Sequence, residues 1–246
     1  MTQALTFKPT ILWVNGSFSP ASFYTTMAEN VRSQGYEIVV DALPSFSRAP
    51  PEQPATMAED AAHFHDIAEK LADQGKGIVM VMHSPVQDGA ERSRQARGII
   101  RLVYFTCVVP EVGVSLRELL LGDDLPWLTI RDDGFMQQVP EEAAGPTFSD
   151  LPKEEGIEWC RKMPLHSVAS FEGKLTYPGY KYVWSSWIFC EKDQILIPDF
   201  QRSCIELIEK ESGKEVDVYS LAVPHCPNIS APMRLANVVV KAVAAA

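Results

Sequence analysis

The sequence lacks an apolar run long enough to cross a membrane and an excess of basic residues, and we expect no leader segment. No stretch approaches the roughly 20 apolar residues of a transmembrane helix, and Met1–Thr10 lacks the apolar core of a signal peptide. Lys and Arg number 22 against 32 Asp and Glu, for a formal net charge of −10. Nucleic-acid backbones and anionic membrane surfaces both select clustered basic residues, so we expect neither as a partner.

Cysteines are few, and their spacing lacks the signature of a disulfide framework. The five positions, 107, 160, 190, 204 and 226, are odd in number and contain no C-x-x-C pair. This is typical of reduced thiols, and we expect a cytoplasmic protein. No cluster of His, Asp and Cys has metal-ligand spacing, so we expect neither a metal nor an organic cofactor.

Apolar segments rich in β-branched and aromatic residues alternate with helical patterns along the chain. Near-continuous apolarity in Ile78–Met82 and Leu102–Cys107 indicates strands buried on both faces, as in a parallel sheet. The alternation predicts a single α/β domain with a doubly wound, mostly parallel sheet of about six strands. The strands are expected at Thr10–Val14, Glu37–Val40, Gly77–Met82, Leu102–Cys107, Trp184–Cys190 and Val216–Leu221, and the helices at Ala21–Ser33, Met57–Gln74, Pro198–Glu211 and Met233–Ala245.

One interval interrupts this alternation. From Pro110 to Tyr182 the chain is rich in proline, glycine and acidic residues, and a structureless loop of that length is improbable inside a compact domain. We expect an inserted cap of short helices at about residues 111–182, with the core formed by residues 1–110 and 183–246. The apolar residues of the interval would form the inner face of the cap, and we expect Trp127 or Phe135 to face a substrate pocket.

Three polar residues follow three different predicted strands. Ser84 comes directly after a buried strand, Asp193 follows the strand that ends near Cys190, and His225 follows the last strand. A serine, an acid and a histidine in this chain order, each at the carboxyl end of a strand, match the order of a hydrolase triad. Glu191 lies two residues before Asp193 and is the alternative acid.

These segments carry a resemblance to a known family. The stretches VMHS (81–84), IFCEKDQILIPDFQ (188–201) and HCPNISAP (225–232) resemble a group of small fungal α/β-hydrolases. That group is similar to the plant methylesterase and hydroxynitrile lyase family. The resemblance spans nearly the whole chain and implies an α/β-hydrolase fold.

The resemblance also assigns roles to particular residues. It implies Ser84 as nucleophile, Asp193 in preference to Glu191 as orienting acid, and His225 as base. It further implies that the segment 15–18, which contains Gly16, Ser17 and Phe18, is the oxyanion loop.

The nucleophile segment departs from the family pattern, which has glycine two residues after the serine. Here Ser84 is followed by Pro85 and Val86. Pro85 has no N–H, although the residue after the nucleophile normally donates one to the oxyanion. Losing one such donor costs roughly 100- to 1000-fold in turnover. Proline also pushes Ser84 toward extended backbone angles, so the sharp turn of the nucleophile becomes harder to hold.

Three functions are therefore compatible with the residues. The first is a hydrolase of an ester, thioester or lactone, in which the Ser17 hydroxyl or the Val86 amide replaces the missing donor. The second is a lyase, isomerase or cyclase in which Ser84 and His225 transfer protons, and the third is an inactive small-molecule-binding protein. In each case the partner is a small, largely apolar carbonyl compound of the secondary-metabolite kind, and the sequence carries no signal for the oligomeric state.

Overall fold

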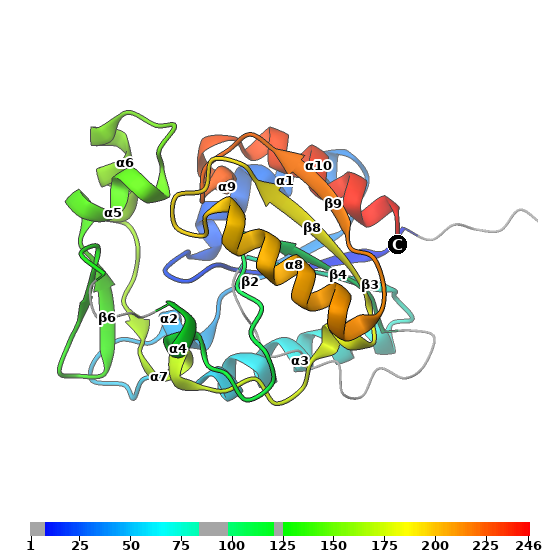
Figure 1. Cartoon of the computed structure of the whole chain (residues 1–246), viewed down its shortest axis with the longest axis horizontal. Coiled ribbons are helices and arrows are strands. Elements are labelled where there is room, and N and C mark those ends of the chain that lie inside the picture. Colours follow the sequence, from blue (N-terminus) through cyan, green and yellow to red (C-terminus); the bar gives the residue numbers. More distant parts are fainter. Residues whose placement is uncertain (1–7, 84–97, 121–124) are drawn as a thin grey trace, which may run out of the picture.

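Six parallel strands form the central sheet of the computed structural model, which describes residues 8–83, 98–120 and 125–246 (Figure 1). The strand order is β2-β1-β3-β4-β8-β9, and every neighbouring pair is parallel. This sheet confirms the doubly wound α/β-hydrolase fold that the sequence predicts. The strands are β1 (Thr10–Val14), β2 (Ile38–Asp41), β3 (Ile78–Met82), β4 (Ile99–Phe105), β8 (Trp184–Cys190) and β9 (Asp217–Leu221).

The inner strands β1 and β3 are buried on both faces, as the continuous apolar runs predict. All five residues of β1 and all five of β3 are buried. The strand β4 differs from the predicted Leu102–Cys107, because Ile99 already pairs with Ile78. It ends at Phe105 because Thr106 adopts a positive φ of 36°, which takes the chain out of the extended conformation.

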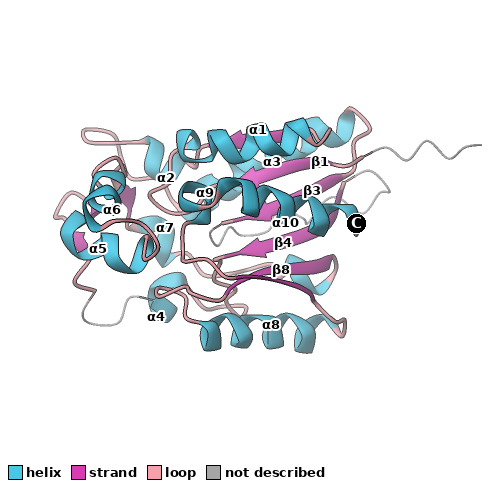
Figure 2. Ribbon diagram, turned by 90° about the horizontal axis from the view of Figure 1, so that it is seen from above, coloured by secondary structure: helices cyan, strands magenta, loops and turns pink. Residues whose placement is uncertain are grey.

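Helices cover both faces of the sheet (Figure 2). One face packs against α1 (Thr25–Ser33) and α10 (Pro232–Ala244), where Trp13 and Phe105 meet residues of both helices in one apolar cluster. The other face packs against α3 (Met57–Asp73) and α8 (Pro198–Ser212). The result is a three-layer α/β/α sandwich, as expected for a parallel sheet whose two faces are both apolar.

Local signals set the ends of these helices. A capping box begins α3: the Thr56 hydroxyl accepts the Glu59 N–H, and the Glu59 carboxylate accepts the Thr56 N–H. Gly213 closes α8 with a φ of 67°. The segment predicted as one helix at Ala21–Ser33 is a 3₁₀ turn, η1 (Ala21–Tyr24), followed by α1. Two one-turn helices, α2 (Pro44–Ser47) and α9 (Pro227–Ser230), lie in loops after strands β2 and β9.

The inserted cap contains a small sheet as well as the expected short helices. Its antiparallel strands lie in the order β5-β6-β7. The signal for the β5–β6 hairpin is Asp133-Gly134, where Gly134 takes a φ of 82° in the turn. The predicted short helices are present, and the small sheet is an addition to them. The elements of the cap are α4 (Leu116–Leu120), β5 (Leu128–Ile130), β6 (Phe135–Gln138), α5 (Pro140–Thr147), α6 (Lys153–Cys160), β7 (His166–Ser167), α7 (Ala169–Glu172) and η3 (Gly179–Lys181).

The cap lies beyond the carboxyl ends of the strands. In Figure 2 the arrowheads of β1, β3 and β4 point toward α5 and α6. No helix in the described ranges is both long and apolar enough to cross a membrane. Open α/β sheets bind ligands at the carboxyl ends of their strands, so the space between this edge and the cap is where a site is expected.

Candidate active site

The loops that follow four strands bring polar side chains to this edge of the sheet. His83 directly follows β3, Thr106 directly follows β4, Asp193 lies three residues after β8, and His225 lies four residues after β9. His83, Thr106 and Asp193 are buried, whereas His225 is partly exposed.

Asp193 and His225 form a hydrogen-bonded pair. Nδ1 of His225 lies 2.9 Å from Oδ2 and 3.1 Å from Oδ1 of Asp193. The carboxylate is itself fixed, because its Oδ1 accepts the backbone N–H groups of Ile195 and Leu196 at 2.8 and 2.9 Å. A carboxylate only accepts, so Nδ1 carries the imidazole proton and Nε2 is left with its lone pair. Nε2 is therefore the nitrogen that can take a proton from a reacting group.

The alternative acid, Glu191, lies away from the imidazole. Its side chain is exposed, while its backbone N–H donates to the carbonyl of Leu221 and continues the ladder between β8 and β9. The chain then turns, and the Asp193 side chain points inward with 2 % of its surface exposed. The structure thus places Asp193, and not Glu191, on His225.

A second network joins His83 to the loop after β1. The Gly16 N–H donates to the Tyr24 hydroxyl oxygen at 2.8 Å, and that oxygen lies 2.5 Å from Nδ1 of His83. The His83 ring also donates to the backbone carbonyl of His225. Burial lowers the pKa of His83 well below its ordinary value, so the ring carries one proton, which it directs to that carbonyl. His83 is then an acceptor for Tyr24 and holds the Gly16 loop against the His225 loop.

The loop after β1 is also tied to the cap. Phe18 adopts a φ of 59°, and its backbone N–H donates to Nδ1 of His166 at 3.3 Å. Nε2 of His166 then donates to the Ser170 hydroxyl at 2.9 Å, which in turn donates to the carbonyl of Ser167. Desolvation by burial lowers the pKa of His166 to about 3, so the ring is neutral and Nδ1 can accept. This hydrogen bond from the cap stabilises the positive φ of Phe18.

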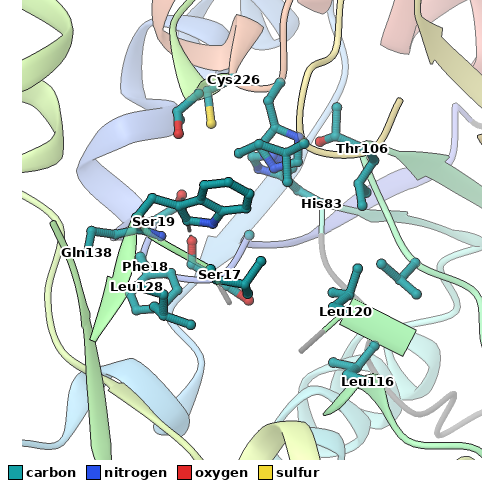
Figure 3. A pocket seen from close by; sticks show the side chains of 18 of the residues that line it. Ser17, Phe18, Ser19, His83, Thr106, Leu116, Leu120, Leu128, Gln138 and Cys226 are labelled. Atoms are coloured by element: carbon teal, nitrogen blue, oxygen red, sulfur yellow. Dashed lines mark hydrogen bonds between the residues drawn. The ribbon is translucent and has the colours of Figure 1, made fainter. Parts of the chain in front are cut away.

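A cavity of about 380 Å³ lies between the sheet edge and the cap (Figure 3). Gly16, Ser17 and Phe18 of the expected oxyanion loop line it, together with Trp127 of the cap. Much of the remaining wall is aliphatic. Its polar lining residues are Ser17, Ser19, His83, Thr106, Gln138, Thr147, His225 and Cys226.

Phe135 is placed differently from the expectation. It is 1 % exposed and does not line the cavity, whereas Gln138 on the same strand does. Successive side chains of a strand point to opposite faces, so Phe135 and Gln138, three residues apart on β6, face opposite ways. Ser84, Pro85 and Val86 lie outside the described residues, and their predicted roles remain predictions.

Within the part of the chain that the structure describes, one group of three side chains has metal-ligand proximity. The ligand atoms of His83, His225 and Cys226 lie within 4.8 Å of one another. The ring of His83 already bonds Tyr24 and a backbone carbonyl, and Nδ1 of His225 bonds Asp193. Burial raises the pKa of the Cys226 thiol well above its ordinary value, which disfavours the thiolate that a metal requires. The group is better explained as part of the hydrogen-bonded site.

Several residues of this site are not among the candidates that the sequence identifies. Tyr24 lies in a predicted helix, and His166 and Gln138 lie in the interval predicted as helices. Thr106 lies inside the predicted strand Leu102–Cys107, whereas in the structure it directly follows the end of β4. Only its polarity within an apolar run could have marked it.

Comparison with known proteins gives two curated fungal relatives. The chain is 33 % identical over 236 residues to probable hydrolase R7 of a Phoma species, covering 94 % of this chain and 97 % of that one. It is 22 % identical over 238 residues to α/β-hydrolase nvfD of Aspergillus novofumigatus, covering 92 % of each chain. No protein-family model matches the chain.

The solved structures include the plant methylesterase MES16 from Arabidopsis. It superposes with a TM-score of 0.70 at 15 % identity, over 97 % of this chain and 100 % of that one. At this identity the likeness concerns the fold. The fungal relatives and this plant structure confirm the resemblance found in the three sequence segments.

Proposed function

The chain belongs to the α/β-hydrolase family, and on that premise we propose that it is a serine hydrolase that cleaves an ester, thioester or lactone of a small, largely apolar substrate. The observation that carries the proposal is the pair of bonds from Nδ1 of His225 to the buried carboxylate of Asp193. They leave Nε2 of His225 as a base on the wall of the cavity. Ser84 is the next residue after His83, which lines the same cavity.

Each residue of the triad then has a defined step. Nε2 of His225 takes the hydroxyl proton of Ser84 as its oxygen bonds to the substrate carbonyl carbon. The same proton passes to the leaving oxygen or sulfur as that bond breaks, giving an acyl-enzyme. Water repeats the sequence and releases the acid. Asp193 holds the imidazole in the tautomer with Nδ1–H and stabilises the imidazolium that forms.

Pro85 favours a second candidate, in which the same residues transfer protons without hydrolysis. The residue after the nucleophile lacks an N–H, so a tetrahedral oxyanion loses one of its usual donors. Proton abstraction beside a carbonyl depends less on that donor. A lyase, isomerase or cyclase acting on the same class of carbonyl compound is therefore the alternative.

The first experiment asks whether Ser84 forms an acyl-enzyme. The wild-type chain and Ser84→Ala are incubated with a 4-nitrophenyl ester series of increasing acyl length, and the release of nitrophenol is measured. A fluorophosphonate probe followed by mass spectrometry identifies the labelled residue. Labelling at Ser84 together with turnover lost in Ser84→Ala is the expected result, while turnover that survives the substitution contradicts the acyl-enzyme.

The second experiment separates hydrolysis from proton transfer. Restoring an amide with Pro85→Ala, alongside Val86→Gly, is expected to raise ester hydrolysis by up to ~100-fold, because one oxyanion donor has about that effect. An unchanged rate, in a wild type that already hydrolyses esters at ordinary rates, would show that Pro85 is no handicap. The lyase or cyclase alternative would then lose its motive.

A further inference from the structure

Thr106 lies in the wall of the cavity and has a buried hydroxyl without a partner. It is 3 % exposed, its Oγ1 makes no hydrogen bond, and it lines the cavity wall beside His83. In Figure 3 the hydroxyl points toward the imidazole side of the cavity. Its φ of 36° is rare for a β-branched residue and strains the backbone. An unsatisfied hydroxyl in the wall of a pocket, on a backbone with a rare positive φ, indicates a ligand contact.

Gln138 presents a second such atom from the cap. Its Oε1 is buried and makes no hydrogen bond, and the residue lines the same cavity. It lies on the last position of β6, and Figure 3 shows it on the opposite side of the cavity from Thr106. The apolar side chains of Leu116 and Leu128 line the same cavity. An unpaired buried amide oxygen is costly, so it too is explained by a group that the ligand supplies.

We propose that this pocket selects a carbonyl compound that also carries a hydrogen-bond donor, a hydroxyl or an N–H, at the end remote from the carbonyl. The Thr106 hydroxyl donates to the carbonyl oxygen near His225, and Oε1 of Gln138 accepts the remote donor. The proposal rests on the proposed function for the position of the carbonyl. It extends that function by naming the second polar group of the substrate.

The physical reason for selectivity is the unpaired group that the wrong ligand leaves behind. A ligand without the remote donor leaves the buried Oε1 of Gln138 without a partner, whereas the correct ligand satisfies it. Sites that hydrogen-bond a substrate hydroxyl reject the analogue lacking it far more strongly than apolar pockets reject a missing methylene. One neutral hydrogen bond of this kind corresponds to about tenfold in affinity.

The test measures binding, not turnover, with ketones that cannot be hydrolysed. The ligands are 4-phenylbutan-2-one, its para- and meta-hydroxy counterparts and their methyl ethers, titrated calorimetrically into the wild-type chain. At least one phenol is expected to bind about tenfold more tightly than the unsubstituted ketone, and its methyl ether to lose that gain. Equal binding of phenol and unsubstituted ketone overturns the proposal, and equal binding of phenol and ether overturns Gln138 as acceptor.

Two variants assign the contacts. Gln138→Met is expected to remove the preference for the phenol while leaving the unsubstituted ketone unchanged, and Thr106→Val to weaken all the ketones about tenfold. The matched controls are Gln137→Met and Thr129→Val, whose side chains are exposed on the same small sheet. If Gln138→Met weakens the binding of every ligand equally, the substitution causes a general packing defect, and the specific contact is overturned.

Binding and catalysis can fail separately. Discrimination between the ketones without any labelling or turnover at Ser84 sustains this inference and refutes the proposed hydrolase. Ester turnover at Ser84 without discrimination between the ketones supports the proposed hydrolase and refutes this inference.

Discussion

The bond between Asp193 and His225 makes the effect of one substitution calculable. In Asp193→Asn the side chain keeps its shape, and its oxygen is expected to stay with the N–H groups of Ile195 and Leu196, which lie 2.8 and 2.9 Å from Oδ1. The new amide NH₂ then faces His225, where Oδ2 lay 2.9 Å from Nδ1. An amide NH₂ donates, so Nδ1 must become the acceptor and the proton moves to Nε2.

The consequence is an imidazole in the wrong tautomer. In the proposed mechanism, Nε2 of His225 can then no longer take a proton from Ser84, and the carboxylate that would stabilise the imidazolium is lost as well. In triads of this kind the same exchange lowers turnover by roughly 10⁴-fold without disturbing the geometry. We therefore expect a fall of that order in kcat, with KM and thermal stability close to those of the wild type.

The assay is steady-state hydrolysis of the best 4-nitrophenyl ester, with thermal unfolding measured on the same samples. Glu191→Gln is the matched control, because it removes the neighbouring acid at an exposed position and is expected to leave turnover unchanged. Activity of Asp193→Asn within tenfold of the wild type would refute the tautomer reasoning. A large loss in Glu191→Gln would transfer the role to that residue.

Three further substitutions test the packing and electrostatics around the site. Gly16→Ala is expected to destabilise the protein by about 1–3 kcal/mol in thermal unfolding, because the new Cβ would lie 2.7 Å from Nδ1 and 2.9 Å from the carbonyl oxygen of His83. In the control Gly145→Ala the Cβ meets nothing within 4 Å, and stability should not fall. Burial raises the pKa of Asp60 to about 6, so ionising this carboxyl lowers the stability of the wild type as pH rises from 4 to 6. Asp60→Asn should therefore become more stable than the wild type over that range, by up to about 3 kcal/mol above pH 7 in denaturant unfolding. A stability difference that does not change with pH would contradict this. Burial lowers the pKa of His166 to about 3, so below pH 6.5 the unfolded chain binds more protons than the folded one. The free energy of unfolding then falls by up to about 1.4 kcal/mol for each unit by which the pH is lowered. In His166→Asn this free energy should fall less steeply in the same measurement, and an equal slope would argue against a buried neutral ring.

The composition and order of the chain are sufficient to predict the central sheet and the helices that cover it. The apolar run Ile78–Met82 is too continuous for a half-exposed strand, so burial on both faces followed from the residues alone, and with it a parallel sheet covered by helices. The pairing of Asp193 with His225 was also predictable, because parallel strands bring their carboxyl ends to one edge. The resemblance by itself favours Asp193 over Glu191.

Tertiary structure alone decided what surrounds that pair. The bond from His166 to Phe18 joins residues 148 positions apart, and the bond from Tyr24 to His83 joins residues 59 apart. Such contacts depend on how the cap and the loops pack, and no local pattern encodes them. The same holds for the unpaired atoms of Thr106 and Gln138, because a polar atom becomes unsatisfied only when folding removes it from water without giving it a partner.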